Sequence, residues 1–579
     1  MVENFRALTG SNHFRVIIFF LVGILNWSLH GNEAQAQISP EGRDRAYKQA
    51  APHRFDRRFG KRSSPKSSVV PIEPKSMAPV FPEDLKGVKF VLKQLFIKGT
   101  TIYDKKTFKP LYRNYLKKEL VLNDIYEIAQ RITNKYRNDG YILSKAIVPP
   151  QKIKNGVVYL TIVEGYIDKV KIQGPIRGPR KLIDQYRKKI LKSRPLRAFD
   201  LERYLLLIDD LPGVTAKSVL TPSEDKPSAT TMTLVLADKA FEGHVGTDNR
   251  GSKFNGPYQF SGDLTANSLF RNHSRLGLQG VVTSQTEELL FLNAFYDIPI
   301  NQEGTRLFFS GSLSDSEPGS SLKQFNINGD STTITLRLTH PFMRSRGKNL
   351  TGHFGFTGRN SSTKILGSLD SEDRLRVMDM GVSYDYADQY KGINLIRFNF
   401  NQGLNIFDAT ESGSSNLSRS KGKSNFTKLT GSFMRIQSLA PSWNFLSSAS
   451  WQFSFDKLLA SEEFGVGGSQ YGRAYDSSEI TGDHGIAFKI ELQKAFRPAW
   501  GYLSDLQFYS FLDYGSVWNK VQTSTGAKRQ DLTSMGLGVR LNLTDSVSGY
   551  FEMNQPVSDN VAAEGNKDPR FFFSLSKRF

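Results

Sequence analysis

From residue 241 to residue 579, apolar and polar residues alternate in segments of about ten residues that are separated by Gly, Asn, Asp and Ser. In residues 485–496, for example, Phe488 and Ile490 fall on one face while Lys489 and Glu491 fall on the other. Such segments are typical of membrane-crossing strands, with apolar side chains toward lipid and polar ones toward the lumen. We count sixteen candidate strands, at 241–250, 258–270, 274–284, 287–299, 305–315, 332–343, 349–360, 374–386, 392–405, 427–438, 443–456, 485–496, 504–518, 533–543, 548–558 and 571–579, of which 548–558 alternates poorly.

A soluble β-sandwich also alternates, but it would need a second sheet to cover its rows of Phe, Ile and Leu. Here the polar faces contain Arg, Lys and Glu, and the chain ends in FFFSLSKRF, with Phe573, Leu575 and Phe579 on one face. This ending resembles the carboxy-terminal signal by which outer-membrane barrels are recognised for assembly. The pattern therefore favours a membrane barrel with an even number of strands around an aqueous lumen.

The part before the barrel repeats one order of elements: strand, helix, helix, strand, strand. The second helix, at 123–138, places Ile125, Ile128 and Ile132 on one apolar face, and Gly140 follows it as a C-cap. Two successive units with one layout indicate an internal duplication. The elements are expected at 89–98, 105–118, 123–138, 142–148 and 157–163, and again at 169–173, 180–191, 200–208, 214–220 and 231–237.

Short motifs in both units carry a resemblance to a known family. YRNDGY at 136–141, VPPQ at 148–151, Asn155-Gly156 and VEGYI at 163–167 resemble the first POTRA domain of two-partner secretion transporters. Leu201-Glu202-Arg203 and DDLPGV at 209–214 resemble the second. This is the haemolysin secretion/activation family (ShlB/FhaC/HecB) of the BamA-like superfamily. The resemblance implies a mainly β chain, with two α+β POTRA domains at 89–167 and 168–239 before a 16-stranded antiparallel transmembrane β-barrel at 240–579.

The amino terminus has the pattern of a secretory signal peptide. Arg6 and Arg15 precede an apolar run, and Ala34 and Ala36 provide the small residues of a cleavage site, so residues 1–36 are expected to be removed. The apolar run is too short for a spanning helix. Residues 37–88 predict a short helix and a Pro-rich linker. In the resembled family such a helix plugs the lumen, while a disordered tail is the alternative.

Composition narrows the expected chemistry. The net charge of +21 is compatible with nucleic acid, an anionic membrane surface or a solvated face, and the export signal argues against nucleic acid. Without cysteine there is no disulfide and no thiol nucleophile. No phosphate-binding glycine loop, nucleophile elbow or metal-spaced His pair occurs, so we expect neither an enzyme, nor a cofactor, nor a metal. In a transporter of the resembled family, a basic helix would bind acidic segments of the secreted protein, its client. The basic side chains of this helix are Arg180, Lys181, Arg187, Lys188 and Lys189.

The segment at 457–484, here called the lumen loop, interrupts two alternating segments with glycines and charges. The family carries a loop here that folds into the lumen, with a glycine pair followed by Val-Arg-Gly-Tyr/Phe. This chain has Gly467-Gly468 and then Gly472-Arg473-Ala474-Tyr475, so the arginine and tyrosine match, while the valine and second glycine are replaced.

The resemblance also implies that the arginine pairs with an aspartate on the inner barrel wall. Strand parity points Asp513 inward. Such a pair would act as a latch, and breaking it would cost about 3–5 kcal/mol. Spacing alone also fits a solvated Arg473 and an ordinary lumen carboxylate.

The resemblance implies translocation of one large exoprotein, of the adhesin or haemolysin kind, across the bacterial outer membrane, with the POTRA domains in the periplasm. The expected partners are this client, outer-membrane lipid and the barrel-assembly machinery, and the chain is expected to work as a monomer. A BamA-like assembly factor is the first alternative, although it typically carries more POTRA units. A diffusion porin is the second, but it would lack residues 89–238.

Overall fold

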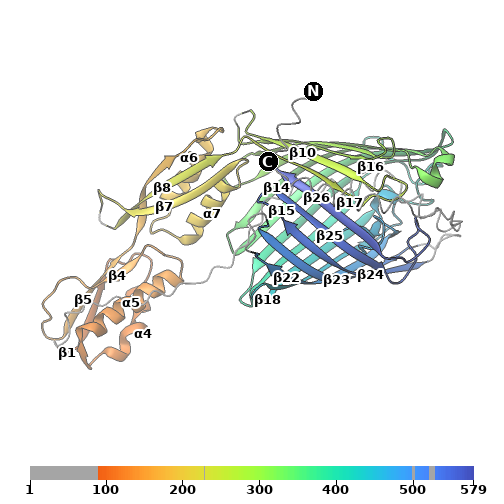
Figure 1. The fold of residues 1–579 in the computed structure, drawn as a ribbon. Coiled ribbons are helices and arrows are strands. Elements are labelled where there is room, and N and C mark those ends of the chain that lie inside the picture. Colours follow the sequence, from red (N-terminus) through yellow and green to blue (C-terminus); the bar gives the residue numbers. More distant parts are fainter. Residues whose placement is uncertain (1–88, 227, 271, 499–502, 521–527) are drawn as a thin grey trace, which may run out of the picture.

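The computed structural model describes residues 89–579 except 227, 271, 499–502 and 521–527. The expected signal peptide at 1–36 and the helix and linker at 37–88 lie outside the described residues. Two α+β units lie at one end of a barrel, which we call the near end, and the opposite end is the far end (Figure 1). The last strand ends at the near end, next to the second unit.

The first unit packs one long helix against a three-stranded sheet. Its helix α5 (Leu122–Asn138) begins where the Asp124 carboxylate accepts a hydrogen bond of 2.8 Å from the Val121 amide. Gly140, with φ +94°, follows it. The apolar face of α5, including Ile128 and Ile132, is fully buried. The other elements are β1 (Lys89–Val91), β2 (Gln94–Lys98), η2 (Lys105–Phe108), α4 (Lys109–Tyr112), η3 (Arg113–Tyr115), β3 (Glu119–Val121), β4 (Lys145–Ile147) and β5 (Val157–Val163).

Three expectations for this unit were wrong in detail. The single strand expected at 89–98 is two strands in different sheets, because the Leu92 amide still bonds the Lys118 carbonyl whereas the Lys93 amide bonds the Gly156 carbonyl. As a result β1 pairs with β3 and β2 pairs with β5. The helix expected at 105–118 is three short turns, since the chain leaves helical geometry at Leu116 and reaches φ +62° at Lys117. The strand expected at 142–148 is only β4, because the Ser144 amide closes a turn onto the Tyr141 carbonyl.

The second unit repeats the arrangement of the first. In each unit the first strand of the three-stranded sheet pairs in parallel with the last, and the remaining strand pairs antiparallel with that last strand. Each unit has its own buried apolar cluster. The elements of the second unit are β6 (Tyr166–Gln173), α6 (Arg180–Lys192), α7 (Ala198–Asp209), β7 (Val214–Pro222) and β8 (Ala229–Asp238). Among the described helices, none has the length and apolar composition needed to cross a membrane.

Sixteen antiparallel strands close into a barrel, with β26 paired to β9, as predicted. Every expected strand is present. The largest shift is at β16, which begins at Ser368 rather than 374, because its polar first residues extend past the apolar band and carry no apolar alternation. The strands are β9 (Phe241–Asp248), β10 (Gln259–Asn267), β11 (Arg275–Thr283), β12 (Leu290–Pro299), β13 (Arg306–Ser316), β14 (Asn328–Arg344), β15 (Lys348–Ile365), β16 (Ser368–Ala387), β17 (Gly392–Gly403), β18 (Thr427–Ala440), β19 (Trp443–Ser454), β22 (His484–Phe496), β23 (Asp505–Trp518), β24 (Arg529–Asn542), β25 (Val547–Pro556) and β26 (Arg570–Arg578).

The outside of the barrel is apolar and the inside is polar. On β22, Phe488, Ile490 and Leu492 are 38–44% exposed on the outside, whereas Glu491 on the inside is only 2% exposed. Exposed apolar rows of this kind need a lipid environment, since no second sheet covers them in the described structure.

Charged contacts join the second unit to the near end of the barrel. Asp210, which follows α7, accepts two hydrogen bonds of 2.7 Å from Arg344 at the end of β14. Arg203 of α7 donates to the Glu303 carbonyl in the turn between β12 and β13 and to the Pro341 carbonyl near the end of β14. Lys189 of α6 lies 2.7 Å from the Glu303 carboxylate. These contacts set the position of the second unit at the near end of the barrel.

One carboxylate braces the first unit. Glu164 accepts hydrogen bonds of 2.8 Å from the Thr101 amide and from the Tyr136 hydroxyl, and one of 3.2 Å from the Ile102 amide. Burial alone would raise the pKa of Glu164, but these hydrogen bonds outweigh it and hold the pKa below its ordinary value. The carboxylate therefore ties the loop after β2 to α5.

Replacing Glu164 with Gln is expected to weaken this network at neutral pH and to have little effect in acid. Because the folded pKa is lowered, the carboxylate stabilises the fold above its ordinary pKa, and this contribution is lost as the pH falls through the folded value. We expect a loss of about 1–3 kcal/mol at pH 7, measured as faster amide exchange at residues 100–103 in the full-length protein.

The matched control is Glu127→Gln, because Glu127 pairs with Arg131 on an exposed helix face, where both side chains are more than 40% exposed. Equal exchange in wild type and Glu164→Gln at pH 7 would contradict the assignment. So would a difference that persisted unchanged at about pH 3, below the ordinary carboxyl pKa.

Candidate functional site

The lumen loop folds back against the inner wall of the barrel between β19 and β22. Its short strands β20 (Phe464–Val466) and β21 (Ile480–Gly482) pair as a hairpin. The buried apolar side chains of its hairpin and tip pack in one cluster with residues of the barrel strands and of other far-end loops: Phe254, Leu322, Ile327, Val466, Ala474, Tyr475, Ile480, Ala487, Val517, Leu532, Val561 and Ala563. This packing therefore fixes the position of the loop inside the barrel.

Glycines make the tip of this loop possible. Gly467 and Gly468 have φ of +119° and +87°, and a Cβ on Gly467 would stand 2.1 Å from the Asp476 carbonyl oxygen. Gly472, where the family pattern has valine, has φ +77°. Ala474, where the family has glycine, is completely buried and has no positive φ. Both departures from the family pattern thus suit the local backbone of this chain.

Arg473 and Asp513 lie together, as the resemblance implies. Arg473 donates from Nε to Asp513 Oδ2 at 3.0 Å and from Nη2 to Oδ1 at 2.9 Å, and its backbone amide donates to Oδ2 at 3.0 Å. Arg473 is 3% exposed and Asp513 is 0% exposed. The pair is bidentate, which fixes orientation as well as distance. The alternative, in which Arg473 is solvated and Asp513 is an ordinary lumen carboxylate, does not fit this geometry.

Two further carboxylates and two further arginines complete a network that we call the inner cluster: Arg250, Arg473, Arg540, Glu491, Asp513 and Glu552. Glu491 accepts 2.7 Å hydrogen bonds from Arg473 and from Arg540. Glu552 pairs with Arg250, and Arg250 also donates to the Arg473 carbonyl at 2.9 Å. The cluster thus balances three guanidinium groups with three carboxylates.

Aromatic rings support each guanidinium of the inner cluster. The central carbon of Arg473 lies 3.4 Å from the centre of the Phe511 ring, and that of Arg540 lies 3.7 Å from the centre of the Tyr509 ring. Arg250 lies 4.0 Å from the Phe572 ring in the same way. Cation–π contacts of this kind add to the ion pairs and restrict the plane of each guanidinium.

Tyr475 anchors the loop to two further segments. Its hydroxyl lies 3.2 Å from the Thr533 carbonyl and 3.1 Å from the Asp559 carbonyl, and it accepts a hydrogen bond from the Asp559 amide. The ring is 1% exposed. Tyr475 therefore connects the loop tip to β24 and to the loop that precedes β26.

A second arginine, which the sequence reasoning missed, holds the base of the lumen loop from the far end. Arg419, in the loop 404–426, donates to Leu458 O and Asp483 Oδ1 at 2.6 Å and to Asn519 Oδ1 at 2.8 Å. Its Nε lies 3.1 Å from Glu463 Oε1. The side chain of Asp483 is 0% exposed and that of Glu463 is 4% exposed. We call Arg419, Glu463, Asp483 and Asn519 the outer clamp.

Apolar contacts accompany the outer clamp. Leu458 and Leu459 of the lumen loop are fully buried against Phe426 of the neighbouring loop and Leu375 of β16. The Ala460 amide donates to the Ser418 hydroxyl at 3.0 Å. The loop 404–426 therefore covers the base of the lumen loop at the far end.

The remaining predicted site residues lie elsewhere. Of the basic residues on α6, Lys189 pairs with Glu303 and Arg187 with Asp184, while Arg180, Lys181 and Lys188 are exposed. Phe573, Leu575 and Phe579 lie on or directly after β26, and Leu575 and Phe579 are 39% and 56% exposed. In the described part of the chain, no three His, Cys, Asp or Glu side chains are grouped to hold a metal ion.

Comparison with known proteins identifies the family. A sequence model described as haemolysin secretion/activation protein ShlB/FhaC/HecB matches residues 235–541, and one described as POTRA domain, ShlB-type, matches residues 90–165. The first match covers more than half of the 579 residues.

Individual relatives span most of the chain. The heme/hemopexin transporter protein HuxB of Haemophilus influenzae is 24% identical over 502 residues, covering 85% of this chain and 88% of that protein. The outer membrane transporter CdiB of Dickeya dadantii is 24% identical over 453 residues, covering 76% and 79%. The structure of CdiB from Escherichia coli superposes with a TM-score of 0.72 at 20% identity, covering 94% of this chain and 100% of that one.

The closed barrel, the ShlB-type POTRA match and the family match agree. The near end of the barrel, which carries the POTRA units, faces the periplasm, and the far end faces the cell surface. The chain belongs to the ShlB/FhaC/HecB haemolysin secretion/activation family and is an outer-membrane transporter of two-partner secretion.

Proposed function

We propose that this transporter secretes one large exoprotein through a barrel that is closed at rest by two separate arginine contacts. The observation that carries the proposal is the position of the lumen loop, whose tip is held by the inner cluster and whose base is held by the outer clamp. A client chain leaving the barrel at the far end would have to displace both contacts. The transporter works as a monomer and reaches the membrane through the barrel-assembly machinery.

The client belongs to the adhesin or haemolysin class of large exoproteins, in keeping with relatives named as hemolysin and heme/hemopexin transporters. In the periplasm it is captured by the POTRA units. The outer edge of β7 is unpaired within the sheet β6-β8-β7, and Val219 on it is 53% exposed, which suits pairing with an extended client strand. Arg180, Lys181 and Lys188 add an exposed positive face for acidic segments.

Deletion of the gene tests the function directly. Loss of one large exoprotein from the medium or cell surface, with other outer-membrane barrels at normal levels, is the expected result. General failure of barrel assembly would instead identify an assembly factor and overturn the proposal. The proteome of purified outer membranes and of the medium distinguishes the two outcomes.

Replacing Asp513 with Asn is expected to release the tip of the lumen loop. The change leaves Arg473 without its bidentate partner in a buried site, which costs about 3–5 kcal/mol. We therefore expect larger and more frequent conductance steps in planar bilayers, together with a lower temperature of barrel unfolding in gel-shift assays. Arg473→Lys keeps the positive charge but lacks the planar guanidinium, so its conductance should lie between that of the wild type and that of Asp513→Asn.

The control for this change is Asp531→Asn, because Asp531 pairs with Arg529 where the side chains are 39% and 54% exposed. That variant should conduct like the wild type. Wild-type conductance and stability in Asp513→Asn would show that the inner cluster does not hold the loop.

A disulfide across the outer clamp tests whether the far end must open. Ser418 and Ala460 are in contact, and the chain has no cysteine of its own, so Ser418→Cys with Ala460→Cys introduces a single pair. We expect the oxidised variant to retain its client in the cell and to secrete again after addition of dithiothreitol. The measurement is the amount of exoprotein in the medium or on the surface before and after reduction.

Each single-cysteine variant serves as a control and should secrete normally in both conditions. Normal secretion by the fully oxidised double variant would mean that the client leaves without separating the loop 404–426 from the lumen loop. The closure at the far end would then have no part in transport.

A further inference from the structure

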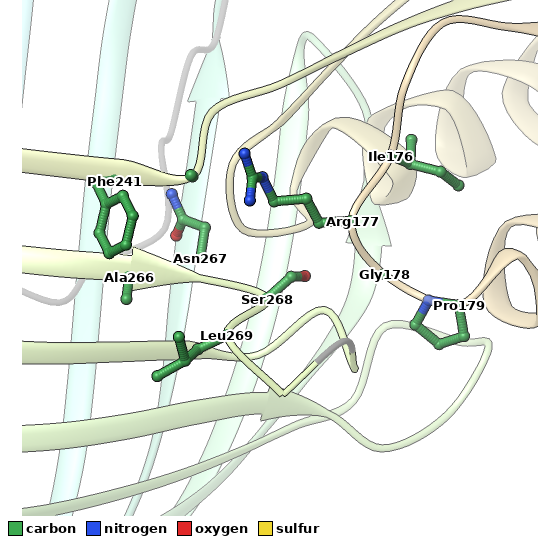
Figure 2. A pocket seen from close by; sticks show the side chains of 10 residues that line it. Ile176, Arg177, Gly178, Pro179, Phe241, Ala266, Asn267, Ser268 and Leu269 are labelled. Atoms are coloured by element: carbon green, nitrogen blue, oxygen red, sulfur yellow. The ribbon is translucent and has the colours of Figure 1, made fainter.

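A pocket of about 690 Å³ lies between the second POTRA unit and the near-end rim of the barrel. Figure 2 shows the POTRA residues Ile176–Pro179 on one side and the ends of β9 and β10 on the other. The lining residues are Ile176, Arg177, Gly178, Pro179, Ala240, Phe241, Ala266, Asn267, Ser268 and Leu269. We call this space the junction pocket. It lies outside the lumen, away from the inner cluster.

The barrel wall of the junction pocket is the lipid-facing side of the barrel. Phe241 and Ala266 are cross-strand partners, and Phe241 is 53% exposed on the outer face, in the same row as the 52% exposed Val245. Leu269, just beyond β10, is 51% exposed. These apolar side chains end the apolar band at its periplasmic edge. The pocket therefore opens toward the periplasmic leaflet of the membrane.

An exposed guanidinium is held in this pocket by a buried carboxylate. Arg177 Nε lies 2.9 Å from Asp238 Oδ2, and the Asp238 side chain is only 5% exposed. The Arg177 side chain is 58% exposed, so its guanidinium remains accessible from the pocket. In Figure 2 the guanidinium points toward Asn267, and Ser268 lines the same pocket. The Asp238 contact thus orients the fork toward the open part of the pocket, where it can bind phosphate oxygens.

A second polar group lacks a protein partner there. Ser268 is 4% exposed, and its buried hydroxyl has no hydrogen-bond partner among the described residues. A buried hydroxyl without a partner is unfavourable, so an external acceptor next to it would be stabilising. This observation is independent of the arginine and points to a ligand with acceptor oxygens.

The pocket is already formed in the absence of a ligand. His273, at the turn after β10, is fully buried, and its Nε2 lies 3.0 Å from the Pro179 carbonyl oxygen. A Cβ on Gly178 would stand 2.1 Å from the His273 ring, so only glycine allows the two segments to approach this closely. This contact fixes the distance between the POTRA loop and the barrel rim.

We propose that the junction pocket binds one phospholipid of the periplasmic leaflet, with its phosphate on Arg177 and Ser268 and an acyl chain along Phe241 and Leu269. A lipid fits better than a free anion because Phe241, Ala266 and Leu269 of the lining are apolar and lie on the lipid-facing side of the barrel. The bound lipid would fill the space between the second POTRA unit and the barrel, and so link membrane composition to the position of that unit.

The experiment titrates delipidated full-length transporter in dodecyl maltoside with palmitoyl-oleoyl phosphatidylglycerol and counts bound lipid by native mass spectrometry. We expect Arg177→Gln to weaken lipid binding at one site by at least about tenfold relative to the wild type, because the change removes a charged hydrogen-bond donor. Ser268→Val should weaken the same site several-fold. Leu269→Asp should also weaken it, because a charge replaces the acyl contact.

Arg497→Gln is the matched control, since Arg497 is another near-end arginine with 89% side-chain exposure, and it should bind lipid like the wild type. A large excess of inorganic phosphate should not displace the lipid. Equal affinity in Arg177→Gln and wild type would overturn the proposal. So would full displacement by phosphate, which would identify a free-anion site. Heat-modifiable gel migration checks folding, and if Arg177→Gln fails it, Ser268→Val and Leu269→Asp carry the test.

Discussion

Charged groups that are buried away from water must be paired with opposite charges, and this requirement determines how the inside of the barrel is organised. Arg473 comes from the lumen loop, while the carboxylates that meet it come from β22, β23 and β25. Arg250, beyond β9, shares Glu552 and binds the Arg473 carbonyl. If Arg473 moves, Asp513 loses its bidentate partner and Glu491 loses one of its two arginines, and both carboxylates are buried. The ion pairs therefore fix the loop tip in one preferred position, although the contacts are polar.

Period-two alternation predicted the part of this arrangement that lies on regular strands. It placed Asp513 and Glu491 inside because neighbouring positions face lipid, and the family resemblance paired Asp513 with Arg473. It did not find Glu552, because Tyr550 on the same inward face is a large aromatic residue that hides the alternation of β25. Tyr550 shares the inward face of β25 with Glu552, and its hydroxyl accepts a hydrogen bond from Arg250 there.

Contacts between loops, and the choice of strand partners, could not be predicted in this way. Arg419 and Asp483 are 64 positions apart in segments without periodicity, so nothing local indicates that they meet. In the first POTRA unit, alternation over 89–98 was correct for strand character, but it carried no information on pairing. The short β3 supplies a partner for β1 that the sequence pattern did not reveal.

The proposed closure by ion pairs has an energetic consequence for transport. The net stability of a buried ion pair is often small compared with an apolar replacement, whereas removing one partner costs about 3–5 kcal/mol. Opening the inner cluster and the outer clamp together would thus cost on the order of 10 kcal/mol if both lost a partner completely. A folded domain is stabilised by about 5–15 kcal/mol, so folding of the client outside the cell is of the right size to drive opening. A polar client chain would lower the cost further, because its own groups can replace the partners that the arginines lose. Arginine contacts therefore suit a channel that must remain closed at rest and still open for a polypeptide.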